Sequence, residues 1–72
     1  MEPAPCVLVT VAGEMSAALG AEFDDLEVTV GHGVSRIRVV GGDASRLHGV
    51  IHRVEALGLE LLDVRREPAD RG

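Results

Sequence analysis

"LEVTVGHGVSRIRVV", residues 26–40, is the stretch that decides the fold of this chain. Apolar and polar residues alternate over residues 26–30 and again over residues 36–39, as they do in strands that bury one face. Between them, "GHG" at residues 31–33 supplies the residues with positive φ that a hairpin turn requires. The stretch therefore predicts a two-stranded antiparallel hairpin.

A strand and a short helix are predicted ahead of the hairpin. "CVLVTVA", residues 6–12, is apolar on both of its alternating faces, which is typical of a central strand covered on both sides. In residues 14–23, the spacing of Met15, Leu19 and Phe23 suits one face of a helix. We therefore expect a strand and then a helix before the hairpin begins.

A longer helix and a last strand are predicted after the hairpin. Asp43 is a good N-cap, because its carboxylate can accept hydrogen bonds from the free amides of a first helical turn. We expect the helix to run to about Leu57 and to end at Gly58 in a left-handed conformation. "LELLDV", residues 59–64, then predicts a strand, and we expect the polar tail "RREPADRG" to fray.

The predicted order is strand, helix, strand, strand, helix, strand, which is the ferredoxin-like βαββαβ arrangement of the α+β class. That fold has a four-stranded antiparallel sheet in the spatial order fourth, first, third, second, with both helices on one face. The 72 residues are expected to form a single domain, with an ordered core of about residues 6–66 and a polar tail over residues 67–72.

A longer segment carries a family resemblance. "DASRLHGVIHRVEALGLELLDVRREP", residues 43–68, resembles the end of the small α+β module at the C-terminus of many ABC-transporter ATP-binding subunits. It is also similar to the end of ACT-type regulatory domains, since both show an apolar helix, a glycine and a short strand. The resemblance implies a ferredoxin-like fold, and its ACT-type form implies a sensor of a small metabolite.

Composition narrows the classes of partner. A net charge of −5 argues against binding to a phosphate backbone, which requires a basic face, and Phe23 is the one aromatic residue available for base stacking. No apolar stretch is long enough to span a bilayer, and a single cysteine, Cys6, cannot form an internal disulfide. We therefore expect a cytoplasmic protein that does not bind nucleic acid and does not insert into a membrane.

The face of the sheet opposite the helices is the predicted contact surface. In the ferredoxin-like order the first and last strands are neighbours, so their surplus apolar side chains would form one stripe on that open face. Such a patch marks an interface more often than a solvent surface, which predicts a homodimer, and the same sheet is a candidate surface for another protein. The residues expected at this interface are Leu8, Thr10, Val40, Leu62 and Val64.

Two histidines are the strongest candidates for chemistry. His48, His52 and Glu55 lie at positions i, i+4 and i+7, so they share one flank of the predicted helix and are candidate ligands for zinc. The simpler interpretation, which we favour, places all three on the exposed edge of the helix. We therefore expect a small non-enzymatic, self-associating interaction or regulatory module without a cofactor. The alternatives are an ACT-like metabolite sensor and a metal-binding protein or small enzyme that uses His48 and His52.

Overall fold

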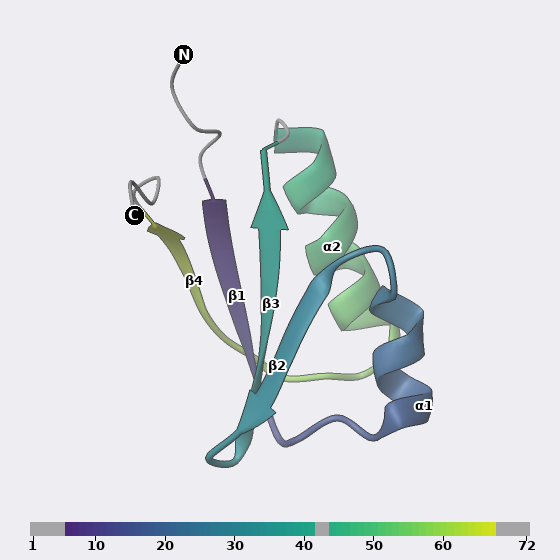
Figure 1. Ribbon diagram of the computed structural model, residues 1–72. Coiled ribbons are helices and arrows are strands. Elements are labelled where there is room, and N and C mark those ends of the chain that lie inside the picture. Colours follow the sequence, from purple (N-terminus) through teal and green to yellow (C-terminus); the bar gives the residue numbers. More distant parts are fainter. Residues whose placement is uncertain (1–5, 42–43, 68–72) are drawn as a thin grey trace.

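The predicted hairpin forms as strands β2 (Glu27–Gly31) and β3 (Val34–Val40) in the computed structural model, which describes residues 6–41 and 44–67 (Figure 1). The two turn residues, His32 and Gly33, have φ values of 58° and 79°. Positive φ at both positions matches the twist of the flanking strands, so the turn closes the hairpin without splaying it. The hairpin prediction is confirmed.

The other two strands complete one antiparallel sheet. Strand β1 (Cys6–Ala12) pairs with β3 on one side and with β4 (Leu61–Glu67) on the other, and the order across the sheet is β2-β3-β1-β4. A four-stranded antiparallel sheet with two helices confirms the α+β class. The boundary predicted for the last strand was wrong, because pairing continues until Glu67 faces Cys6, and residues expected to fray belong to β4.

The first helical segment is shorter than predicted. Helix α1 (Ala17–Gly20) begins after Ser16, whose Oγ accepts a hydrogen bond from the Leu19 N–H at 3.2 Å. A single 3₁₀ turn, η1 (Ala21–Phe23), continues it. The predicted start at residue 14 was wrong because a serine three residues before a free amide is a good cap, and helices begin at their caps.

Helix α2 (Ala44–Ala56) follows the hairpin and ends as predicted. Gly58 has a φ of 76°, and the Leu59 N–H donates to the Val54 carbonyl at 3.1 Å. This bond closes the helix end in the way that a left-handed glycine permits. The predicted cap, Asp43, lies outside the described residues.

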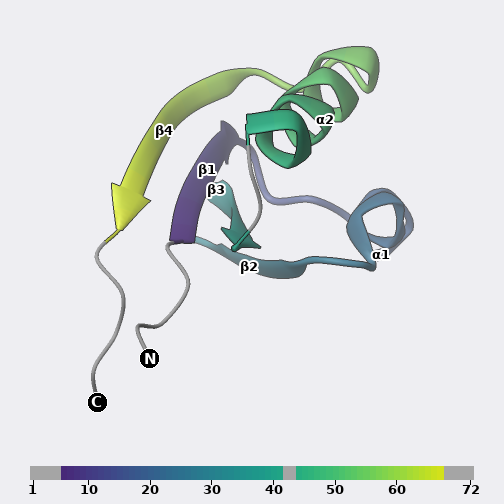
Figure 2. The same ribbon diagram turned by 90° about the horizontal axis from the view of Figure 1, so that it is seen from above.

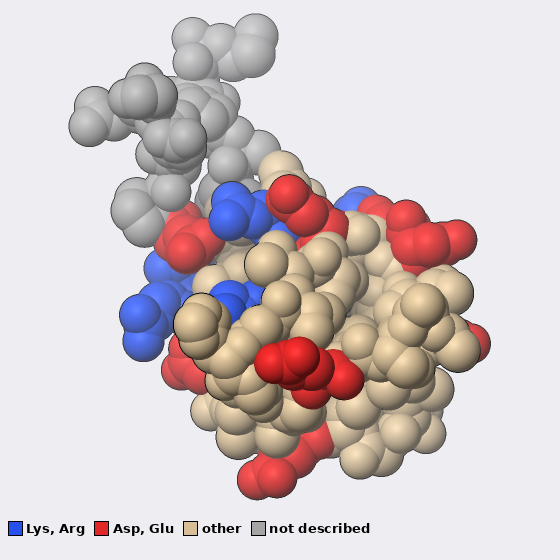
Figure 3. Space-filling model, turned by 60° about the horizontal axis from the view of Figure 1, so that its bottom comes forward, with Lys and Arg blue, Asp and Glu red and all other residues tan. Residues whose placement is uncertain are grey.

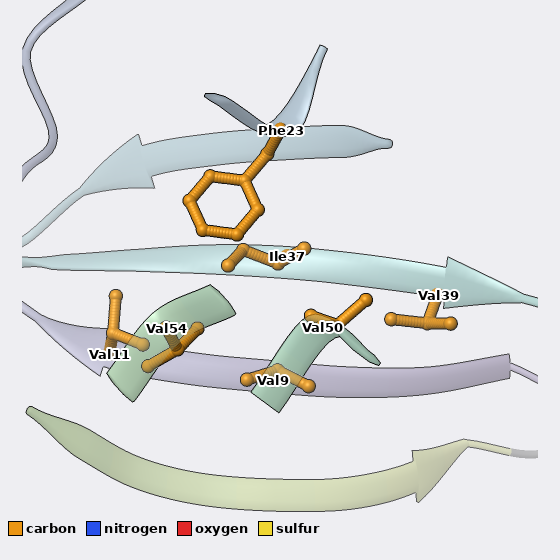
Figure 4. Packing of buried hydrophobic residues seen from close by; sticks show 7 residues of the cluster. All are labelled: Val9, Val11, Phe23, Ile37, Val39, Val50 and Val54. Atoms are coloured by element: carbon orange, nitrogen blue, oxygen red, sulfur yellow. The ribbon is translucent and has the colours of Figure 1, made fainter. Parts of the chain in front are cut away.

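Both helices lie on the same face of the sheet (Figure 2). The core forms between them and the three strands β1, β2 and β3, and the ring of Phe23 lies over Ile37 (Figure 4). No helix in the described part of the chain is both long and apolar enough to span a membrane. The buried core residues are Val9, Val11, Phe23, Ile37, Val39, Val50 and Val54.

The end of the molecule that carries the β2–β3 turn has a mostly uncharged surface (Figure 3). Acidic side chains interrupt that surface at separate points, and the basic side chains in this view gather on one side. The coloured atoms of this view therefore include no continuous basic surface of the kind that a phosphate backbone requires.

Candidate functional site

The open face of the sheet carries charge rather than the apolar stripe expected from the sequence. Arg38 Nε lies 3.4 Å from Glu27 Oε1, and Arg38 Nη1 lies 3.9 Å from Glu67 Oε1. Arg65 Nε lies 3.6 Å from Asp63 Oδ2 on β4. These pairs link side chains of β2, β3 and β4 on one face, so much of the surface predicted to be an interface is occupied by ion pairs.

Three of the five predicted interface residues do lie on this open face. Thr10 faces Arg36 across the β1–β3 ladder, and Leu8 faces Arg38, which places both beside the charged side chains. Val40 is 53% exposed at the end of β3. The open face therefore offers only isolated apolar groups between arginines.

The other two predicted interface residues lie on the opposite side of the sheet. Val64 faces Val9, whose side chain is fully buried beneath the helices, and directly opposed residues in an antiparallel pair share a face. Leu62 is two residues from Val64 and so shares its side. Their predicted position on the open face was wrong, because β4 contains a register shift opposite Thr10 and Val11, which sequence alternation does not reveal.

The apolar residues of β4 nevertheless remain exposed. Leu61, Leu62 and Val64 keep 38%, 49% and 40% of their surface accessible. The reason is the position of α2, whose buried residues Val50 and Val54 lie over β1 rather than over β4 (Figure 4). These three residues of the edge strand, which we call the β4 strip, are the clearest candidate contact surface among the described residues.

The structure places the candidate zinc ligands on the surface of α2. His48, His52 and Glu55 are all exposed on α2. Among residues 6–41 and 44–67, no three His, Cys, Asp or Glu side chains are grouped closely enough to hold a metal ion. The structure therefore does not support the hypothesis of a zinc site at these three residues.

Arg53 joins α2 to the first helical segment. This contact was not predicted from the sequence. Its Nη1 donates to the Glu22 carbonyl at 2.9 Å and to Asp25 Oδ1 at 3.1 Å, and its guanidinium carbon lies 5.5 Å from the centre of the Phe23 ring. The hydrogen bond from Arg53 lowers the pKa of the Asp25 carboxyl below its ordinary value. No sequence pattern indicated this contact, because the partners lie 28 and 31 positions apart.

Ser35 and Cys6 are the buried residues with reactive side chains. The Ser35 Oγ donates to the Gly13 carbonyl at 2.8 Å and accepts from the Met15 N–H at 2.9 Å, so it fixes the loop before α1. The Cys6 thiol lies 3.9 Å from Glu67 Oε1. Both groups have partners within the fold, which is consistent with structural roles.

Comparison with known proteins assigns the chain to a family. No curated protein and no solved structure matches it. One family model, described as a domain of unknown function (DUF8691), matches residues 6–65, from the start of β1 into β4. The match covers more than half of the 72 residues. The chain therefore belongs to the DUF8691 family of domains of unknown function.

Proposed function

We propose that this domain is a small non-enzymatic interaction module that dimerises through the β4 strip. The observation that carries the proposal is the exposure of three apolar side chains, Leu61, Leu62 and Val64, on a strand at the edge of the sheet. A contiguous exposed apolar patch on a small domain marks a contact surface more often than a solvated one. An edge strand also presents free backbone groups to a partner.

The expected energy of covering the β4 strip supports the proposal. Complete burial of a valine or leucine side chain contributes roughly 1.5–3 kcal/mol. The three side chains keep between 38% and 49% of their surface exposed. Covering them would therefore contribute about 2–4 kcal/mol for each copy, which is comparable with much of the stability of a domain of this size.

The β4 strip is a better contact surface than the open face. On the open face, burying Arg38 and its carboxylate partners would remove their hydration, and surface ion pairs compensate for that loss only weakly. Leu8, Thr10 and Val40 are the apolar or weakly polar groups that would offset this cost. The proposed contact is therefore the edge of the sheet at β4.

We further propose that the fold belongs to the ferredoxin-like class. The support is the order of elements, two strand–helix–strand units joined by the β2–β3 hairpin, together with the strand order, which read from the other edge is β4-β1-β3-β2. A solved structure of any member of the family would test this assignment.

Sedimentation equilibrium of the purified chain at micromolar concentration tests self-association. We expect a dimer, and we expect Val64→Glu to raise its dissociation constant at least about tenfold, because a charge would enter the apolar contact. Val30→Glu is the matched control, since Val30 is 42% exposed on β2, the other edge strand. A monomeric wild-type chain, or equal loss of dimer in both variants, would refute the proposal.

A further inference from the structure

The free edge of β4 offers a way for two copies of this chain to join their sheets. Within residues 6–41 and 44–67, β4 is the last strand in the order β2-β3-β1-β4, and it pairs with β1 on one side only. Two identical edge strands related by a two-fold axis perpendicular to the sheet pair in antiparallel orientation. This axis keeps the helix-covered faces of both copies on the same side of the joined sheet. A residue on the helix-covered face of one copy must therefore face a residue on the helix-covered face of the other, and likewise for the open face.

This geometry leaves a short series of possible registers, each centred on one residue of β4. A centre at Asp63 places that carboxylate opposite its own copy. A centre at Arg65 places two arginines opposite each other and sets Asp63 against Glu67. A centre at Arg66 also places two arginines opposite each other. Like charges directly opposed across a strand pair are destabilising, so these three registers are unfavourable.

A centre at Leu62 is also unfavourable. It sets Leu61 against Asp63 and leaves the arginines of β4 without an opposite charge. It also places the axis at the register shift opposite Thr10 and Val11, where β4 departs from regular pairing.

The register centred on Val64 forms only favourable side-chain pairs near the axis. Asp63 of each copy faces Arg65 of the other, which gives two ion pairs on the open face. Val64 faces Val64 of the second copy on the helix-covered side, and the aliphatic stem of Arg66 lies along Leu62. Asp63 and Arg65 already lie on the open face with 51% and 72% of their side chains exposed, so both are accessible for this pairing.

We infer, building on the proposed function, that two copies pair through their β4 strands about a two-fold axis at Val64, forming one continuous sheet. The charge pattern of β4 specifies a second copy of this chain as the partner. Val64 of each β4 strip then meets its own copy at the axis, and Leu62 of each copy packs along the stem of Arg66 of the other copy.

A cysteine at the axis tests this inference. In a Cys6→Ala background, Val64→Cys is expected to form an intermolecular disulfide, because facing residues in an antiparallel pair have Cα atoms about 4.5–5.5 Å apart, within the span of about 4.4–6.8 Å that a disulfide allows. Arg66→Cys is the control, since its two copies would lie about 13 Å apart along the strand. Circular dichroism verifies that each variant is folded.

Charge reversal provides a second test that does not depend on cysteine. Asp63→Arg and Arg65→Asp each oppose like charges in a homodimer, so each is expected to raise the dissociation constant about tenfold. An equimolar mixture of the two variants restores both ion pairs, so it is expected to give a heterodimer by sedimentation.

The outcomes separate this inference from the proposed function. A wild-type dimer that forms no disulfide through Val64→Cys, and whose charge variants do not recover on mixing, overturns the β4 pairing but leaves self-association intact. A monomeric wild-type chain overturns both.

Discussion

Replacing Ser35 with alanine is the sharpest test of what holds this fold together. Ser35 is fully buried on β3, and its Oγ bonds both to the Gly13 carbonyl and to the Met15 N–H. The substitution removes a single oxygen and leaves these two backbone groups without their partner. Because both bonds are partly buried, water replaces the hydroxyl only in part.

The expected loss is large for a domain of this size. Leaving one buried polar group unsatisfied costs about 1–3 kcal/mol, and partial access to water places each of these two groups near the lower limit. The free energy of unfolding should therefore fall by about 2–3 kcal/mol, out of a total of about 4–11 kcal/mol for 72 residues. The corresponding drop in Tm is about 10–20 °C.

Urea unfolding followed by far-ultraviolet circular dichroism measures this loss. Ser16→Ala is the control, because it deletes the same hydroxyl at an exposed cap and should cost about 1 kcal/mol. If Ser35→Ala lowers stability by no more than Ser16→Ala does, the two buried bonds do not stabilise the fold as argued.

Three further predictions concern the helices, the turn and the histidines. Arg53→Met should lower the Tm by a few degrees, since it removes the contacts to Asp25 and the Phe23 ring at a partly exposed site. Arg53 lowers the pKa of Asp25 in the folded state, so the Arg53–Asp25 contact stabilises the fold fully above the ordinary pKa of 3.8 and loses this effect as the pH falls through the lowered pKa. The difference in stability between wild type and Arg53→Met should therefore shrink in acid. A difference that stays constant with pH would contradict this assignment. Gly33→Ala should destabilise the fold by about 1 kcal/mol because the φ of Gly33 is 79°, whereas Gly49→Ala, in the exposed middle of α2, should stabilise it by about the same amount. If the two substitutions shift the Tm in the same direction, this contrast is refuted. Added zinc should leave the Tm unchanged, and a zinc-dependent rise that His48→Ala abolishes would restore the metal hypothesis.

Local signals predicted the elements whose ends are marked by particular residues. The alternation on either side of His32 and Gly33 predicted the hairpin, because a turn with positive φ is encoded in the few residues that form it. Gly58 marked the end of α2 for the same reason. The start of α1 was missed, although Ser16 could have indicated it as a cap.

Contacts between distant segments were beyond the reach of sequence patterns. Ser35, Ile37 and Val39 are spaced by two residues, which indicated that Ser35 shares the core-facing side of β3. Nothing in the sequence indicated that Ser35 bonds to the loop before α1. The contact of Arg53 with Asp25 is of the same kind. Both depend on how α1 and α2 are placed over the sheet.

The sequence by itself determined the α+β class, the central position of β1 and the apolar character of β4, because each follows from periodicity within a few neighbouring residues. Only the tertiary structure decided which side of β4 faces the helices. A strand has a period of two, so a one-residue shift in pairing moves every side chain to the other face. The register shift opposite Thr10 and Val11 therefore moved Val64 from the expected open face to the helix-covered side, and with it the candidate contact surface.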